Sequence, residues 1–454
     1  MDDLQLLQKY NVPVPRYTSY PTVPYWIDDI NIADWKNLFQ LRFKEGNKAE
    51  GISLYFHLPF CESLCTYCGC NKKITTNHKV EEDYIRIILK EWHMYTALMD
   101  EPPVVREIHL GGGTPTFFSP ENLKKLINAV LDDAVIHPNH DFSVEGHPNN
   151  TTPEHLQALY DIGFRRVSFG VQDMDEEVQR VINRFQPFEN VKLATENARK
   201  IGYTSVNFDL IYGLPLQTQA KMQRTIEQCI TLRPERVAFY SYAHVPWTSK
   251  GQRLFDENDL PTVDEKMKLY ILGKKLFSES GYHDIGMDHF SLPGDDLHNA
   301  FLEGRLHRNF MGYTTQQSAI LIGLGVSSIS DTGNGYAQND KTLHDYYANI
   351  EAGELAIKKG FFLSEEDMHF KKYILDISCK GKTTFQPGYK HLLDTYTIPE
   401  LKKLEADKLV VVSETGVEAT PLGRHFIRNI CATFDIYLQR NKAEKGEKKF
   451  SKAI

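Results

Sequence analysis

The sequence lacks several features that define whole classes of protein. No apolar run approaches the roughly 18 residues that a membrane-spanning helix needs. The first residues, MDDLQLLQKYNVPVPRYTSYP, are acidic and interrupted by prolines, unlike a signal peptide. Positive charge is not in excess either, because the formal net charge is −8, which argues against binding nucleic acid through phosphate contacts. We therefore expect a cytoplasmic protein with neither a membrane nor a nucleic-acid partner.

Cysteine is scarce outside one short stretch. Four of the seven cysteines lie in HLPFCESLCTYCGCN, residues 57–71, at positions 61, 65, 68 and 70. The other three, Cys229, Cys379 and Cys431, are scattered along the chain and are most simply buried thiols. The concentration of thiols in one loop predicts a dedicated chemical role for it.

Three interpretations of this loop compete. A disulfide pair is disfavoured in a reducing compartment. Structural zinc usually takes two ligand pairs a dozen or more residues apart, and His57 and His78 do not stand at zinc-finger spacing. An iron–sulfur cluster suits C-x3-C-x2-C, because three thiolates on a four-iron cubane leave one iron open for chemistry.

Apolar, β-rich segments alternate with helical ones along most of the chain. The expected strands are residues 52–59, 106–113, 142–148, 165–172, 205–213 and 236–246, with 285–290 as a candidate for one more. Between them, ENLKKLINAVLDD places its apolar residues on one helical face, and Ser119 followed by Pro120 is typical of a helix start. Six such units predict an α/β fold, a partial (β/α)6 TIM-like barrel with a parallel sheet.

Chemistry in such barrels lies at the carboxyl ends of the strands. The unusual residues of this chain fall there: the cysteines after the first strand, GGGTP (111–115) after the second, Glu145, Gln172 and Asp209 on the next three, and residues 242–244 on the sixth. This agreement predicts a ligand-lined mouth at that end of the barrel.

The chain changes character near residue 365. IPELKKLEADKL and PLGRHFIRNI are expected helices, and VVVSETGVEAT is an expected hairpin turning at 414–416, a small winged-helix-like pattern that we interpret as a lid or packing module. We divide the chain into an N-terminal extension (1–45), a core barrel (46–290), a substrate-side extension (291–364) and a C-terminal, mostly helical domain (365–454).

The cysteine motif resembles that of the radical S-adenosylmethionine (SAM) superfamily, C-x3-C-x-Tyr-C, and the Cys68-Gly69-Cys70 that completes it resembles the oxygen-independent coproporphyrinogen III oxidases. Further resemblance to these oxidases covers nearly the whole chain, in PRYTSYPT (15–22), NFDLIYGLP (207–215), MDHF (287–290), HRNFMGYTTQ (307–316), GLGVSSIS (323–330) and RNICATFDIYL (428–438). It implies a [4Fe–4S] cluster on Cys61, Cys65 and Cys68, with SAM on the open iron and Cys70 as a non-ligand.

The resemblance also implies roles for residues of the barrel. The expected catalytic set is the three cluster cysteines with Tyr55 and Glu145. The residues expected to hold the cluster-bound SAM are Tyr55, Gly112, Glu145, Gln172 and Arg184. Those expected at a second SAM are Tyr67, Gly113, Thr114, Asp209, Ala243 and Ile329. The chain departs from the family at EGHPN (145–149), where Glu-Val-Asp-Pro-Arg is expected.

The implied reaction converts coproporphyrinogen III to protoporphyrinogen IX, turning two propionates into vinyl groups through a 5′-deoxyadenosyl radical. Arginine suits the substrate carboxylates, and Arg16 and Arg308 are the candidates, near Arg305 and His307. A one-electron donor such as a flavodoxin or ferredoxin is implied, and we expect a monomer. The alternatives are a haem chaperone, a radical SAM enzyme that opens or methylates haem, and a zinc module.

Overall fold

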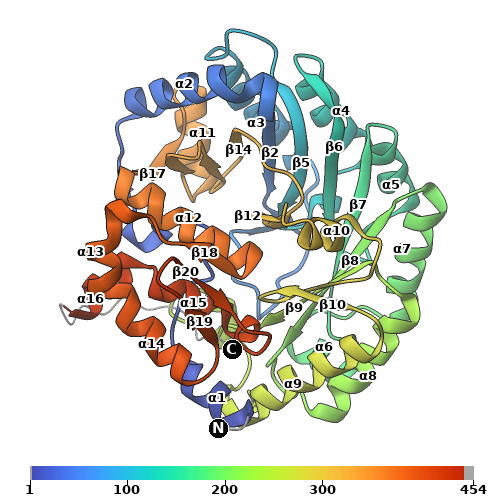
Figure 1. Ribbon diagram of the computed structural model, residues 1–454. Coiled ribbons are helices and arrows are strands. Elements are labelled where there is room, and N and C mark those ends of the chain that lie inside the picture. Colours follow the sequence, from blue (N-terminus) through green and yellow to red (C-terminus); the bar gives the residue numbers. More distant parts are fainter. Residues whose placement is uncertain (1–2, 444–454) are drawn as a thin grey trace.

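The computed structural model describes residues 3–443 and is built around one long, curved sheet (Figure 1). Seven neighbouring strands of this sheet are parallel. In sheet order they are β14 (Ile320–Leu324), β2 (Ile52–Leu58), β5 (Val104–Gly112), β6 (Val135–Gly146), β7 (Phe164–Gln172), β8 (Ser205–Tyr212) and β9 (Arg236–Ser241). The six strands from β2 to β9 confirm the predicted partial barrel.

Antiparallel strands extend both edges of the parallel part. Beyond β14 lie β15 (Ile329–Asp331), β16 (Gly335–Asn339), β17 (Ile357–Phe362) and β1 (Ile27–Asp28). Beyond β9 lie β11 (His289–Ser291) and β10 (His283–Gly286). The single strand expected over 285–290 is therefore wrong, because the chain reverses at Met287, whose φ of 48° turns it back into a hairpin.

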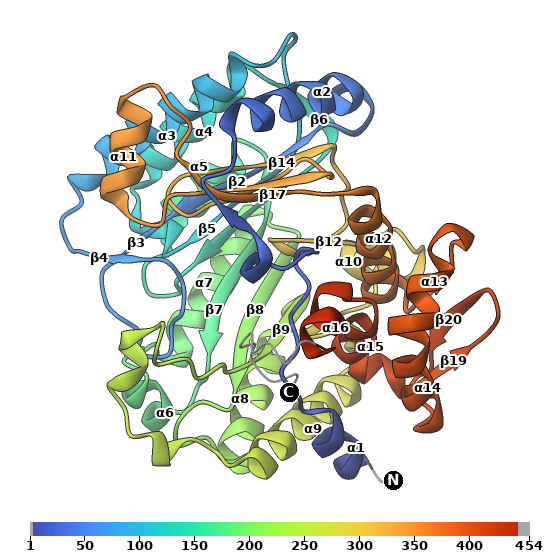
Figure 2. The same ribbon diagram turned by 90° about the vertical axis from the view of Figure 1, so that its left-hand side faces the viewer.

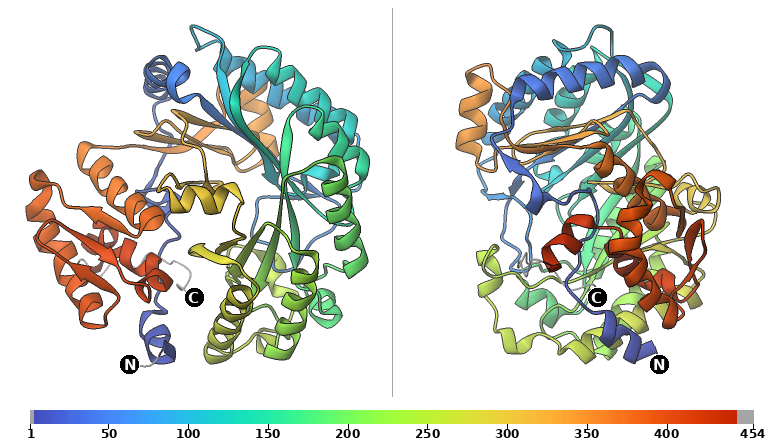
Figure 3. Two further views of the ribbon diagram at one scale, coloured as in Figure 1. Left: turned by 45° about the vertical axis from the view of Figure 1, so that its right-hand side comes forward. Right: turned by 60° about the vertical axis from the view of Figure 1, so that its left-hand side comes forward.

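Helices cover the outer face of the sheet and leave its concave face to the interior, as Figure 3 shows. They are α2 (Ile32–Glu50), α3 (Val80–Thr96), α4 (Pro120–Leu131), α5 (Pro153–Tyr160), α6 (Glu176–Val181), α7 (Phe188–Ile201), α8 (Gln219–Leu232), α9 (Val263–Glu279) and α11 (Leu343–Glu351). The short helix α10 (Asp296–Leu302) instead lies on the concave side and packs against β10. No helix within residues 3–443 is long and apolar enough to cross a membrane.

Local sequence explains where these elements begin. The Ser119 side chain accepts a hydrogen bond from the Asn122 backbone N–H with Pro120 at the first helical position, so α4 starts as its sequence predicts. Strand β2 is buried along almost its whole length, because helices cover one face of the sheet and the barrel interior lies on the other. Its near-continuous apolar sequence follows from that double burial.

The C-terminal region packs beside the barrel as a separate group of elements (Figure 1). It contains α12 (Glu365–Lys380), η5 (Pro387–Tyr389), α13 (Lys390–Leu392), η6 (Leu393–Thr397), α14 (Ile398–Ala406), η7 (Gly423–Phe426), α15 (Ile427–Thr433) and α16 (Ile436–Ala443). A small sheet is formed by β18 (Lys382–Thr384), β20 (Gly416–Ala419) and β19 (Val410–Val412), in that order. Strands β19 and β20 form the expected hairpin. The division of the chain into four segments stays a prediction, and helix α2 continues across the boundary placed between residues 45 and 46.

The N-terminal segment, residues 11–21, follows α1 (Asp3–Tyr10) and passes between the barrel and the C-terminal region (Figure 2). The Arg428 guanidinium donates to the carbonyl oxygens of Val14 and Pro15, at 2.6 and 3.3 Å. The Tyr17 hydroxyl donates to Asp435 at 3.0 Å. The two ends of the chain therefore hold each other across the open side of the barrel.

Candidate active site

The three cysteines predicted to bind the cluster lie in the cysteine loop, residues 61–70, which leaves β3 (Phe60–Cys61) and returns to β4 (Lys73–Ile74). Neighbouring segments hold the loop by its backbone. The Thr66 N–H donates to the Ile182 carbonyl at 2.9 Å, and Asn183 Nδ2 donates to the Leu64 carbonyl at 2.7 Å. On the other side, Ser249 Oγ donates to the Cys68 carbonyl at 2.8 Å. The loop is therefore fixed from both sides before any ligand binds.

Hydrogen-bond donors reach the sulfur atoms of two of the three cysteines, and the pKa of the third thiol is lowered; the thiolate is the form that binds iron. The Thr114 hydroxyl donates to Cys61 Sγ at 3.3 Å, although burial still raises the pKa of that thiol. Arg184 Nη1 donates to Cys65 Sγ at 3.6 Å. A hydrogen bond with Cys70 lowers the pKa of Cys68 to about 6, against the effect of burial. Within residues 3–443, no three His, Cys, Asp or Glu side chains converge as a site for a single metal ion.

Glycines let the GGGTP turn pack directly against the strand before the cysteine loop. A Cβ on Gly113 would lie 2.6 Å from the Pro59 carbonyl, and Gly112 has a φ of +114° with a Cβ position only 2.7 Å from the His57 ring. The turn therefore requires glycine at both positions. The Gly112 N–H is left pointing at Glu145 Oε2, at 3.3 Å.

Glu145 stands at the end of β6 and is held from behind by His109. His109 Nε2 lies 3.2 Å from Glu145 Oε1, and its Nδ1 lies 2.8 Å from Ser143 Oγ. Burial alone would raise the pKa of Glu145, but the hydrogen bonds from His109 and Gly112 leave it below its ordinary value. The side chain stays 43% exposed, so a ligand can reach this carboxylate. His109 was not among the residues predicted from the sequence, where its only signal is its position two residues before the GGGTP turn.

Tyr55 and His57 point into the same region from β2. The Tyr55 hydroxyl lies 3.2 Å from His57 Nδ1, and His57 Nε2 lies 2.9 Å from the Asn71 carbonyl. Because the Nε2 proton goes to that carbonyl, Nδ1 accepts and Tyr55 donates. Tyr55 also stacks on His109, with ring centroids 5.9 Å apart. These contacts link the β2 side of the site to Glu145.

Gln172 and Arg184 meet at the end of β7. Gln172 has a φ of 66°, and Arg184 Nη2 donates to the Gly170 carbonyl at 2.5 Å. A Cβ on Gly170 would lie 2.6 Å from the Gln172 amide and 2.8 Å from Arg184. Because Gly170 has no side chain, the Gln172 amide and the Arg184 guanidinium can both lie against it, and Arg184 also reaches Cys65.

The residues predicted for a second SAM are distributed around the same end of the barrel. Asp209 accepts hydrogen bonds from Ser168 at 3.0 Å and from Asn207 at 2.9 Å. Burial first, and then the nearby charge of Glu145, raise the pKa of Asp209 to about 6. Gln252 Nε2 donates to the carbonyls of Tyr67 and Ala243, at 2.8 and 3.2 Å, and so ties these two positions together.

A cavity of about 650 Å³ lies beside the cysteine loop. Of the predicted residues, its lining includes Tyr55, Gly112, Glu145 and Ile329, and Cys70 also reaches it. Phe310 and Met311 approach it from the hairpin of β12 (His307–Asn309) and β13 (Gly312–Thr314). Gln172, Arg184, Asp209 and the second-SAM residues other than Ile329 are not part of this lining.

The residues of EGHPN (145–149) that differ from the family pattern stabilise the neighbouring turn in this chain. Asn149 Nδ2 donates to the Phe185 carbonyl at 2.9 Å, directly after Arg184. Burial and the nearby Arg184 lower the pKa of His147 to about 3, so its imidazole is neutral. These residues therefore hold the turn that carries Arg184 without adding charge beside it.

Arg16 and Arg308 lie together on the open side of the barrel. Arg308 Nη2 donates to the Arg16 carbonyl at 3.3 Å, and Arg16 Nη2 donates to the Ser241 carbonyl at 3.1 Å. Arg308 is only 7% exposed, yet its Nε and Nη1 have no hydrogen-bond partner among the described residues. His289 Nδ1 is also buried and has no hydrogen-bond partner among the described residues. Burial lowers the pKa of His289 to about 4.

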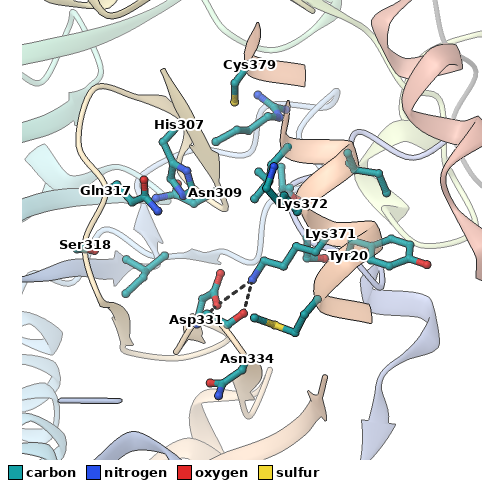
Figure 4. A pocket seen from close by; sticks show the side chains of 18 of the residues that line it. Tyr20, His307, Asn309, Gln317, Ser318, Asp331, Asn334, Lys371, Lys372 and Cys379 are labelled. Atoms are coloured by element: carbon teal, nitrogen blue, oxygen red, sulfur yellow. Dashed lines mark hydrogen bonds and ion pairs between the residues drawn. The ribbon is translucent and has the colours of Figure 1, made fainter. Parts of the chain in front are cut away.

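A second cavity, also about 650 Å³, lies between the β12–β13 hairpin and α12 (Figure 4). His307 points into it, opposite Lys371, which lies 3.4 Å from Asp331. Arg305 and Arg308 also line this cavity, and Leu321 lines both cavities. The hairpin therefore separates the cavity at the cysteine loop from one near the opposite ends of the strands.

A partial barrel with a three-cysteine loop after its first strand defines the class of radical SAM proteins. The sequence profile of the Radical SAM superfamily matches residues 55–229. The chain is 38% identical to the oxygen-independent coproporphyrinogen III oxidase of Synechocystis sp. over 99% of this chain and 97% of that protein. It is also 38% identical to the oxidase of the same name from Escherichia coli, over 100% and 98%.

This chain belongs to the family of oxygen-independent coproporphyrinogen III oxidases. The solved structure of coproporphyrinogen III oxidase (HemN) from Escherichia coli, described as a radical SAM enzyme, superimposes with a TM-score of 0.89 at 36% identity. The superposition covers 96% of this chain and 99% of that one. Membership of the superfamily implies a [4Fe–4S] cluster and SAM, and the three thiols with their hydrogen-bond donors fit such a cluster.

Proposed function

We propose that this chain is an oxidoreductase that converts coproporphyrinogen III to protoporphyrinogen IX without oxygen, in haem biosynthesis. Two propionate side chains each lose one hydrogen atom, CO2 and one electron and become vinyl groups; the hydrogen atom goes to SAM, and we propose a one-electron acceptor outside the chain for the electron. The observation that carries this function is the match to these oxidases over the full length of the chain, with both the barrel and the C-terminal region included. All seven cysteines are free thiols, which fits the reducing cytoplasm that we propose as its location.

Cys61, Cys65 and Cys68 are the proposed cluster ligands, and Cys70 is proposed as a neighbour that binds no iron. When bound, the cluster and SAM supply the radical chemistry that removes a hydrogen atom from a propionate. Glu145, held by His109 and Gly112, is placed to accept hydrogen bonds from SAM, and Arg184 and Gln172 flank it on the β7 side.

A second SAM at Tyr67, Gly113, Thr114, Asp209, Ala243 and Ile329 remains part of the proposal. Two turnovers per substrate consume two SAM molecules, whether they bind together or in sequence. The linked positions of Tyr67 and Ala243 support a common site.

Arg308 and Arg16 are the proposed binding site for the substrate carboxylates. A tetrapyrrole with four carboxylates needs cations that hydrogen-bond them directly. Arg308 offers two buried nitrogens that lack partners within residues 3–443, and Arg16 adjoins it. We propose that these residues, with His289 as a neutral neighbour, hold propionates that do not react. The N-terminal segment would close over the bound substrate and exclude water.

The test is anaerobic. The purified chain, reconstituted with iron and sulfide, is mixed with dithionite, SAM and coproporphyrinogen III, and the products are followed by mass spectrometry. Loss of two CO2 with two equivalents of 5′-deoxyadenosine per product is expected. Cleavage of SAM without decarboxylation would contradict the function and favour a haem-handling or haem-modifying protein.

A further inference from the structure

The cavity beside the cysteine loop has a wall that the proposed function leaves unused. Its lining runs from β2, β5 and β6, which carry Tyr55, Gly112 and Glu145, across β14 and β15 to Gln338 on β16. Glu145 contributes the carboxylate of this lining and Lys341 its ammonium group, and Glu145 is already proposed to bind SAM. What Gln338 recognises there depends on the substrate, and so rests on the proposed function.

Gln338 carries an acceptor atom that is left without a partner. The residue is 8% exposed. Its Nε2 donates to the Ser327 carbonyl at 3.3 Å, whereas its Oε1 is buried and has no hydrogen-bond partner among the described residues. The amide is not reversed, because a carbonyl oxygen only accepts and requires the NH2 side of the amide. No other residue of this lining, all of which lies within residues 3–443, has a buried side-chain polar atom without a partner.

The backbone around Gln338 fixes the direction of this acceptor. Strand β16 pairs on both sides, so that Gln338 is opposite Ile329 of β15 and Lys359 of β17. Ser327, which accepts from the amide, has a φ of 60°, and its N–H donates to the Asp340 carbonyl at 2.7 Å. A non-glycine residue keeps such a conformation only where the structure around it imposes it. The amide oxygen is therefore held in place before a ligand binds.

The substrate of the proposed reaction supplies the missing donor. A porphyrinogen has four pyrrole rings joined by saturated carbon bridges, and each ring carries an N–H group that donates. In the oxidised porphyrin, two of the four nitrogens have lost their hydrogen, and the other two N–H groups lie in the plane of a flat ring and point at its centre. An amide oxygen beside the ring therefore distinguishes the reduced macrocycle from the oxidised one, because only the reduced one satisfies it.

We propose that Gln338 Oε1 accepts a hydrogen bond from a pyrrole N–H of the bound substrate and so selects the porphyrinogen over the porphyrin. No bond is made or broken at this contact. Because the proposed reaction changes the propionates and leaves the ring N–H groups as they are, the same hydrogen bond is available to the substrate through both decarboxylations.

The test compares two tetrapyrroles on the reconstituted holoenzyme under anaerobic conditions. Coproporphyrinogen III and coproporphyrin III carry the same four propionates and differ in the oxidation state of the ring. Dissociation constants are measured by ultrafiltration without reductant or SAM, and the free tetrapyrrole is quantified by its fluorescence after oxidation.

The variant is Gln338→Met, which keeps the length of the side chain and removes the acceptor. The matched control is Gln439→Met. Gln439 is 9% exposed and donates to the Ala432 carbonyl at 2.7 Å, as Gln338 does to Ser327, but it lines neither 650 Å³ cavity.

Wild type should bind coproporphyrinogen III more tightly than coproporphyrin III. Gln338→Met should weaken the binding of coproporphyrinogen III about tenfold, because a hydrogen bond is lost and a pyrrole N–H is left unpaired. Its affinity for coproporphyrin III, its content of iron and sulfide and its affinity for SAM by calorimetry should match wild type. Gln439→Met should match wild type in both tetrapyrrole affinities.

Equal weakening of both tetrapyrroles in Gln338→Met would mean that the residue only shapes the cavity, and an unchanged affinity for coproporphyrinogen III would mean that the acceptor is not used. Either result overturns the proposal. A loss of SAM affinity would assign Gln338 to SAM and would overturn it as well.

Wild type decides alone if Gln338→Met does not fold. Binding of coproporphyrinogen III that is no tighter than that of coproporphyrin III then overturns the proposal. If wild type shows the preference but does not decarboxylate coproporphyrinogen III, the proposed function fails and the assignment of Gln338 stands.

Discussion

Replacing Arg308 with Gln separates what this side chain does for the substrate from what it does for the fold. Its Nε and Nη1 are buried and lack partners among the described residues, so they are available to a carboxylate. A hydrogen bond to a charged group contributes about 1.5–3 kcal/mol, and losing one side of a buried charge pair costs about 2–5 kcal/mol. A loss of about 3–4 kcal/mol lowers kcat/KM for coproporphyrinogen III by about 10²–10³-fold.

The same substitution should not harm the fold. In the absence of substrate Arg308 keeps one hydrogen bond to Arg16 and lies 4.7 Å from the Tyr313 ring, but two of its nitrogens are buried unsatisfied. Removing the charge should therefore raise the free energy of unfolding, by on the order of 1 kcal/mol.

The assays are anaerobic kinetics with coproporphyrinogen III and denaturant unfolding of the apoprotein. Arg305→Gln is the matched control, because Arg305 is exposed and already paired with Glu303. Arg308→Lys, which keeps a charge but not the planar donors, should give an intermediate kcat/KM. Wild-type kcat/KM in Arg308→Gln, or a loss of activity that merely follows a loss of stability, would refute the reasoning.

Three further predictions concern the cysteine loop and its surroundings. Cys61→Ser should abolish retention of iron and sulfide after reconstitution, whereas Cys70→Ser should retain both; equal loss in the two variants would make Cys70 a ligand. Glu145→Gln should weaken SAM binding about tenfold by calorimetry on the reconstituted protein, since a charged acceptor is lost, and an unchanged affinity would remove Glu145 from the SAM site. Burial raises the pKa of Asp209 from its ordinary 3.8 to about 6. Between pH 4 and 6 the folded protein therefore keeps a proton on this carboxyl that the unfolded chain releases. Stability falls as the pH rises through this range, and the ionised carboxyl destabilises the fold above pH 6. Asp209→Asn should then raise the free energy of unfolding at pH 8 by on the order of 2 kcal/mol, with the gain fading toward pH 4; a gain independent of pH would contradict the assigned cause.

The barrel strands could be located from the sequence because each contains closely spaced apolar residues, which are buried continuously in β2 and alternately in β8. Sequence reasoning treated 323–330 only as a motif and missed β14, a five-residue strand whose pairing with β2 brings together positions 268 residues apart, from Ile320 to Ile52. It also missed the reversal at Met287, since a positive φ at a non-glycine residue leaves no compositional signal.

Some residues of the candidate site could be predicted from the sequence and others could not. The positions of Cys61, Cys65 and Glu145 follow from short spacing and strand ends. The burial of Arg308, and the orientation of Glu145 by His109, depend on contacts between separate strands. Such contacts exist only after the sheet has closed, and one sequence does not reveal them.

The hydrogen bonds between Arg428 and the N-terminal segment have a consequence for synthesis on the ribosome. Val14 and Pro15 are translated 413 or more residues before the Arg428 that binds them. Until then the open side of the barrel lacks its cover, while Cys61, Cys65, Cys68 and the strands around them are already complete. The segment that holds the N-terminal residues over the open side is therefore made only after the whole cysteine loop and all the parallel strands.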